Sequence, residues 1–219
     1  MKRAYVGKEV VAGGVKIQVK QVLGFGDTDV RNRVQRIATT AQGWLAKTLP
    51  EVRSNMDANV AAVFQACFRC APEPAAVMTA KAVLTTTYNS LRKPHGIKIR
   101  NDDDAYGYVS LSYGGRRHLT NGVVFYDEQG DAIHRMGEIH IDNATVRNDM
   151  TMAVITYIHE ATHRFVNTDD HGDQGYFRSD GSDYSQPGLT WQQALKNADS
   201  YAYFVYKTMQ ARYRSVIVA

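Results

Sequence analysis

Five consecutive residues, His159-Glu160-Ala161-Thr162-His163, have the HExxH spacing that is typical of zinc hydrolases. On an α-helix, residues four positions apart lie on one face, so His159 and His163 can both reach one ion at about 2.0–2.1 Å. Glu160, next to the first histidine, can hold and deprotonate the water that such an ion activates. The residue types therefore predict two metal ligands, His159 and His163, and a general base, Glu160.

The residues around the motif have a helical pattern. Asn148 or Asp149 can cap the start of the helix, and apolar residues follow at helical spacing. These apolar residues are Val154, Ile158, Ala161 and Phe165. The alternative interpretation is a core helix whose histidines are only hydrogen-bonded, but two histidines that bracket a glutamate favour the metal site.

A catalytic zinc site needs a third protein ligand and leaves the fourth position to water. The chain has no Glu after Glu160, so a downstream Glu cannot complete the site. A short polar stretch just beyond the helix, residues 167–172, offers Asp169 and Asp170 instead. We expect the third ligand to come from this stretch.

Spacing alone leaves both aspartates open. Asp169 lies ten residues after His159, which is the interval of the metzincins, but Val166 stands where those enzymes have the Gly that permits their turn. Asp170 lies seven residues after His163. The missing glycine makes the metzincin arrangement less favourable.

Three separated motifs resemble those of the aspzincin peptidases, the family of deuterolysin and lysine-specific metalloendopeptidase. HEATH is followed by residues 168–170 (TDD), by a Tyr-bearing loop and by residues 197–201 (NADSY). In that family HExxH precedes GTxDxxYG, where the Asp is the third zinc ligand and the Tyr lies near the developing oxyanion. The resemblance covers roughly residues 150–204, and it implies a Zn²⁺ ion with Asp170 as its third ligand.

The chain departs from the family pattern at two positions. Asn167 replaces the Gly, and Asp173 stands where the family has its Tyr. The nearest tyrosine is Tyr176, which we take as the catalytic tyrosine of a lengthened loop, with Tyr184 as a second candidate. His171 is a further candidate for stabilising the oxyanion.

The resemblance also implies a role for Asp199 in substrate binding. It lies in the NADSY-like segment, on a helix that lines the pocket for the residue just after the scissile bond. Ala202 stands where the lysine-specific enzymes have a second acidic residue. We therefore expect a preference for Lys or Arg after the cut that is weaker than theirs. The alternative is that Asp199 orients a metal ligand.

Composition excludes several classes of protein. The chain has 219 residues, 44% of them hydrophobic, which is enough for one sizeable core. The net charge of +4 is spread along the chain, and its basic clusters lack interleaved aromatics, so we expect no nucleic-acid partner. No segment approaches the length of a membrane span, so we expect no membrane partner.

Charged residues interrupt the beginning of the sequence, which has no apolar stretch of signal-peptide length. We expect a protein without a signal peptide that is cytoplasmic when made. Export would then use a secretion system that does not read an N-terminal signal. A bacterial secreted effector fits this pattern, and it would have a cognate inhibitor or immunity protein as a partner.

Hydrophobic periodicity predicts helices at both ends of the chain and strands in its middle. Helices are expected at residues 29–47, 58–69 and 74–91, and a capping box of Thr190 and Gln193 opens a single final helix. A strand or hairpin arm is expected within residues 10–22, and strands are expected at residues 97–100, 108–113, 122–126 and 138–141.

These elements predict an α+β, zincin-like fold, mostly helical, with a small mixed or antiparallel sheet. Residues 1–26 would form an N-terminal extension or strand segment, and residues 27–219 the metallopeptidase domain. Residues 138–143 are the candidate edge strand along which a peptide could pair, and the alternative is a strand that only supports the core.

The sequence favours a zinc endopeptidase that acts on protein or peptide substrates. Two alternatives remain open: a zinc amidase that acts on cell-wall peptides, and a non-catalytic binding protein that zinc stabilises. The first shares the same catalytic residues. The second has no use for a carboxylate beside the first ligand, so Glu160 argues against it.

Overall fold

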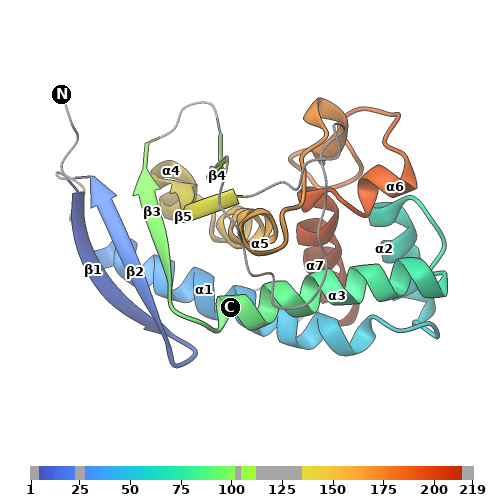
Figure 1. Ribbon diagram of the computed structural model, residues 1–219, viewed down its shortest axis with the longest axis horizontal. Helices are drawn as coiled ribbons and strands as arrows, with labels where there is room; N and C mark the ends of the chain where they lie inside the picture. The colour runs from blue at the N-terminus through green and yellow to red at the C-terminus, as the bar shows by residue number, and fades with distance from the viewer. Residues whose placement is uncertain (1–4, 23–27, 102–104, 112–134, 214–219) are drawn as a thin grey trace.

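Helix α5 (Met150–Val166) carries the HExxH motif through the middle of the fold, where Figure 1 shows it end-on. Asp149 caps its start by accepting a hydrogen bond from the backbone N–H of Met152 at 2.8 Å. Every side chain from 153 to 163 is buried, because the sheet, α1, α3 and α7 all contact this helix. The motif therefore lies on a central helix that packs against other elements on several sides.

The computed structural model describes residues 5–22, 28–101, 105–111 and 135–213, and these contain one mixed five-stranded sheet. Its strands are β1 (Tyr5–Ala12), β2 (Val15–Val22), β3 (His95–Arg100), β4 (Gly107–Leu111) and β5 (Arg135–Asp142), in the order β1-β2-β3-β5-β4. The β1–β2 and β4–β5 pairs are antiparallel, whereas β2–β3 and β3–β5 are parallel. Gly13 and Gly14, both at positive φ, form the two-residue turn of the first hairpin.

Helices cover the sheet and extend away from it (Figure 1). The other α-helices of the described residues are α1 (Thr28–Thr48), α2 (Ala58–Phe68), α3 (Pro74–Leu91), α4 (Asn143–Asn148), α6 (Trp191–Ala194) and α7 (Ala198–Arg212), with short 3₁₀ turns at Leu49–Glu51 and Gly172–Gly175. Helices α1 and α3 run beneath α5, and α2, α6 and α7 gather at the end away from the first hairpin. Within the described ranges, none of the helices combines the length and apolar composition that crossing a bilayer requires.

The α+β class and the mostly helical composition are confirmed, and the sheet is of the mixed kind. The three expected N-terminal helices form within one residue of their expected bounds, and the expected strand at 122–126 lies outside the described residues. The capping box of Thr190 and Gln193 forms, but it opens only α6. The single final helix was wrong, because Asn197 leaves the helical conformation to pair with Asp169.

The expected edge strand was also wrong. Residues 138–143 belong mostly to β5, which pairs with β3 on one side and β4 on the other. Among the described strands, β4 is the edge on this side of the sheet. Period-two patterning assigns strands but carries no information on their order, so the sequence could not distinguish these two neighbours.

Gly107 allows β4 to approach α5 closely. A Cβ atom at this position would lie 2.7 Å from the backbone oxygen of His140, 2.7 Å from Thr156 Cγ2 and 3.1 Å from Glu160 Cγ. The first two distances are shorter than any normal contact, so a side chain here would push β4 away from the helix. Gly107 thus sets the spacing between the edge strand and the helix that carries the motif.

We expect Gly107→Ala to lower the free energy of unfolding by about 1–3 kcal/mol, as overpacking usually does. Urea denaturation at equilibrium measures this change. Gly43→Ala is the matched control, because Gly43 is an exposed residue of α1 with no atom within 4 Å of its missing Cβ. That control should stabilise the protein by up to about 1 kcal/mol through helix propensity. Equal effects of the two substitutions would contradict the proposed role of Gly107.

Candidate metal centre

Three ligand atoms converge at the surface of α5. The Nε2 atoms of His159 and His163 lie 2.9 Å apart, and Asp170 Oδ1 lies 2.8 Å from His163 Nε2 and 3.1 Å from His159 Nε2. Ligands of a tetrahedral ion with bonds of about 2.0–2.1 Å lie roughly 3.3 Å apart, so outward shifts of a few tenths of an ångström admit one zinc ion. Two imidazoles and a carboxylate are also a donor set that suits zinc.

A left-handed residue at the end of α5 brings Asp170 back toward the two histidines. Asn167 has φ 63° and ψ 39°, and its backbone N–H donates to the carbonyl of His163 at 3.0 Å. This conformation suits glycine, and asparagine tolerates it better than most other residues. The replacement of the family's Gly by Asn167 is therefore compatible with the same turn.

Asp169 ties the turn to the start of α7. Its backbone N–H donates to the carbonyl of Lys196 at 2.7 Å, and its carbonyl accepts from the N–H of Ala198 at 2.9 Å. Its side chain accepts from the N–H of Asp170 at 2.9 Å. These contacts give Asp169 a structural role in the turn, while the neighbouring carboxylate faces the histidines.

Gly175 packs directly against the Asp170 backbone. A Cβ atom at Gly175 would lie 1.6 Å from the carbonyl oxygen of Asp170, which is a severe overlap. The side-chain amide of Asn197 donates to the Gly175 carbonyl at 2.7 Å and to Ser200 Oγ at 3.1 Å. The lengthened loop is thus held against the residue that supplies the third ligand atom.

Hydrogen bonds at Nδ1 fix both imidazole rings. His159 Nδ1 lies 2.6 Å from Asp199 Oδ1, and His163 Nδ1 lies 2.7 Å from the Thr168 carbonyl oxygen. An ionised carboxylate and a carbonyl can only accept, so each Nδ1–H must donate. Nε2 is then the nitrogen directed at the convergence point, and its lone pair can bind a metal ion once Nε2 has lost its proton.

Negative charge dominates this buried cluster. Burial alone would lower the pKa of His159, but hydrogen bonds to Asp170 and Asp199 raise it well above its usual value. Burial would raise the pKa of Asp170, but the charge of His163 and hydrogen bonds from both histidines hold it far below its usual range. Carboxylates that stay ionised next to imidazoles favour a cation at this point.

Glu160 also faces the cluster, and His159, Glu160 and His163 form a buried group that could bind a metal ion. Glu160 Oε1 lies 3.7 Å from His159 Nε2, farther than Asp170 Oδ1 does. We regard Asp170 as the better third ligand because it lies within 3.1 Å of both imidazole nitrogens. Glu160 then remains beside the three ligand atoms without being one of them.

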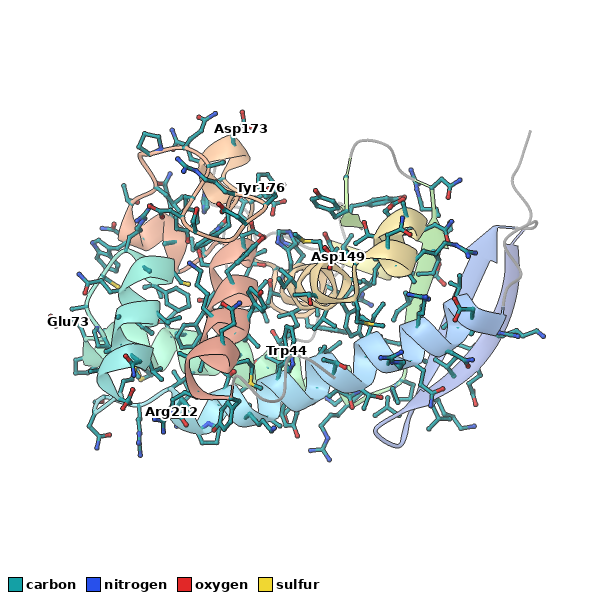
Figure 2. All side chains as sticks on the ribbon, turned by 180° about the vertical axis from the view of Figure 1, so that it is seen from behind. Trp44, Glu73, Asp149, Asp173, Tyr176 and Arg212 are labelled. Carbon is teal, nitrogen blue, oxygen red and sulfur yellow. The ribbon has the colours of Figure 1, made fainter. Side chains whose placement is uncertain are left out.

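The tyrosine candidates have different surroundings. Tyr176 is 41% exposed, its ring stacks at 6.2 Å from that of His159, and Figure 2 shows it on the side of its loop that faces α5. Tyr184 is buried, and its hydroxyl contacts the Cys67 carbonyl and Ser200 Oγ. Only Tyr176 of these two lines the cavity beside the cluster.

Asp199 contacts His159 at Nδ1, the ring nitrogen that faces away from the other ligand atoms. Its second oxygen, Oδ2, accepts the backbone N–H of Phe177 at 2.9 Å, so both carboxylate oxygens have partners. These contacts favour the orienting role over the substrate-binding role that the resemblance implied. The motif order indicated that Asp199 belongs to the site, but not which of its neighbours it would bind.

A cavity of about 650 Å³ opens in front of the ligand atoms. One wall comes from β4 and α5, and the other from residues 176–179 and α7. Sequence patterns did not identify several lining residues. These are Tyr106, Val109, Phe177 and Tyr203. A strand pattern could have indicated Val109, but no sequence signal places the two walls opposite each other.

The fold resembles that of a zinc peptidase from Grifola frondosa. The alignment covers 83% of this chain and 97% of that protein, with a TM-score of 0.59 and 15% sequence identity. The zincin-like fold expected from the motifs is thereby confirmed, and the inferred family resemblance holds at the level of the fold. The sequence matches no protein-family model and no curated protein.

We expect Asp170→Ala to lower the affinity for Zn²⁺ by more than about 100-fold, because it removes one of three ligands. Asp169→Ala is the matched control, and it should cost no more than roughly 10–100-fold, the usual effect of a residue that only supports a ligand. Competition with a chromogenic chelator measures both affinities. The reverse order would assign the third ligand to Asp169.

We expect Asp199→Asn to weaken Zn²⁺ binding by roughly 10–100-fold while the protein stays folded. The amide would present an NH₂ group to either the His159 or the Phe177 N–H, where an acceptor is needed. The control is Asp183→Asn, the same change at an exposed carboxylate that pairs with Arg69. Chelator competition measures the Zn²⁺ affinity, and thermal melting measures any loss of stability. An unchanged Zn²⁺ affinity in Asp199→Asn would exclude the orienting role.

Proposed function

We propose that this protein is a zinc-dependent endopeptidase. The observation that carries the proposal is the convergence of His159, His163 and Asp170 beside Glu160, at the bottom of an open cavity. The fold of a zinc peptidase supports the same activity. A purely structural zinc site would gain nothing from a cavity or from a second carboxylate, Glu160, beside the three ligands.

His159, His163 and Asp170 would hold the zinc ion, and their buried Nδ1–H partners keep the rings in the orientation that binding requires. When bound, the ion polarises the substrate carbonyl and lowers the pKa of water. Glu160, which is 3% exposed, takes the proton of the attacking water and later gives it to the leaving amine.

Tyr176 is the group that we propose for stabilising the oxyanion. Its ring lies beside His159 and lines the cavity, and a phenolic hydroxyl is a donor that can stabilise a developing negative charge there. This assignment follows the family's use of a tyrosine in the loop after the third ligand. Tyr176 lies three residues beyond the position of the family's Tyr, which is consistent with a lengthened loop.

The substrate backbone would bind along β4. This edge strand lines the cavity through residues 107–109, next to Glu160. An extended peptide that pairs with a strand edge gains hydrogen bonds from its backbone and needs no particular sequence. Such binding positions a carbonyl in the middle of a chain near the zinc site, as an endopeptidase requires.

We expect Glu160→Gln to retain Zn²⁺ and a normal melting temperature but to lower kcat by roughly 10²–10⁴-fold, because the glutamine cannot accept the proton of water. The control is Glu73→Gln, an exposed glutamate at the start of α3 that Figure 2 shows far from Tyr176. The assay follows cleavage of an unfolded protein by the zinc-loaded enzyme, with and without chelator. Equal rates for parent and Glu160→Gln would refute the mechanism, and chelator-sensitive cleavage confined to cell-wall fragments would indicate an amidase instead.

A further inference from the structure

The cavity in front of the cluster has three carboxylates among its described lining residues, and all three are engaged. Asp170 faces the two histidines, and Glu160 lies beside His159. Asp199 uses one oxygen for His159 and the other for Phe177. None of them remains to pair with an ammonium or guanidinium group of a substrate without leaving the metal site.

The rest of the lining is apolar or neutral. On α5, Met152 and Ile155 lie on the same helix face as His159, roughly 10 Å and 6 Å from it along the helix axis. Val109 on β4 completes this wall, and Phe177 and Tyr203 stack on each other at 4.5 Å in the opposite wall. Burial raises the pKa of the Tyr203 hydroxyl, so this group is neutral at physiological pH.

A cation stands behind the opposite wall. Lys207 Nζ lies 4.9 Å from the centre of the Phe177 ring, on α7, and donates to the Ser182 carbonyl. A basic substrate side chain in the cavity would therefore have this positive charge nearby, while the carboxylates of the described lining already contact the histidines and Phe177. This arrangement disfavours Lys and Arg on electrostatic grounds.

We propose that the cavity binds an apolar or aromatic substrate side chain next to the scissile bond, between Met152 and Ile155 on one wall and Phe177 and Tyr203 on the other. This inference rests on the proposed peptidase function and names its substrate class. A side chain bound 6–10 Å along the helix from His159 belongs to a residue adjacent to the bond that is cut. Burying a Leu or Phe side chain there removes apolar surface from water, which favours such a substrate by at least about tenfold over one with Lys at that position.

A redesign of the wall tests the proposal. Met152→Glu places a carboxylate in the cavity at the third residue of α5, a helix position that favours glutamate. Ser179→Glu places one on the opposite wall, at an exposed loop position that tolerates change. Met78→Glu, at a residue of α3 that is 71% exposed and outside the cavity lining, is the matched control.

The zinc-loaded parent and variants are incubated with a peptide library, and the cleavage sites are mapped by mass spectrometry. We expect the parent to prefer Leu, Met, Phe or Tyr over Lys at one position flanking the cut, by at least about tenfold in kcat/KM. Met152→Glu or Ser179→Glu should raise the ratio of Lys to Leu cleavage by about tenfold, and Met78→Glu should leave it unchanged. Cleavage mainly next to Lys or Arg by the parent, or an unchanged ratio in both wall variants, would overturn the proposal.

A binding experiment distinguishes a failure of this proposal from a failure of the proposed peptidase function. Calorimetry measures the affinity of zinc-loaded Glu160→Gln for two peptides that differ only by Leu or Lys at the selected position. Tighter binding of the Leu peptide without cleavage by the parent would retain the apolar cavity and reject the peptidase function. Cleavage without this difference in affinity or rate would reject the apolar cavity alone.

Discussion

His159 and His163 lie on a buried face of α5, and a shared metal ion requires the Nε2 atoms of both rings to face the same point. The Nδ1–H group of each ring is then also buried, and it needs a hydrogen-bond acceptor from the protein because water is excluded. An unpaired buried N–H would cost about 1–3 kcal/mol, and a rotated ring would bring the wrong nitrogen to the metal. Asp199 supplies one acceptor and the carbonyl of Thr168 the other. Because both acceptors lie outside α5, the site depends on where the rest of the chain places them.

The segment between α6 and α7 meets this requirement. Leaving the helical conformation at Asn197 allows the backbone to pair with Asp169 and the side chain to hold Gly175. The first turn of α7 then brings Asp199 to His159. This short segment thus supports Asp170 from one side and His159 from the other. A change here would alter the proposed metal site without replacing either residue.

The proposed substrate surface and the proposed metal site share the same helix. Met152 and Ile155 lie one to two turns before His159 on one face of α5, and β4 approaches this face because Gly107 has no side chain. The spacing between strand and helix therefore affects both the position of Glu160 and the width of the cavity. Packing in this part of the core is coupled to the chemistry that we propose.

The sequence by itself determined the features that depend on local spacing: the HExxH helix, the capping box at Thr190, the three N-terminal helices and the run that holds Asp169 and Asp170. Helical periodicity and capping are local, so they can be read from neighbouring residues. Only the tertiary structure decided which strand forms the edge, which aspartate faces the histidines and which partners Asp199 binds. Those outcomes depend on strand order and on contacts between residues as far apart as His159 and Asp199, and no local pattern encodes them.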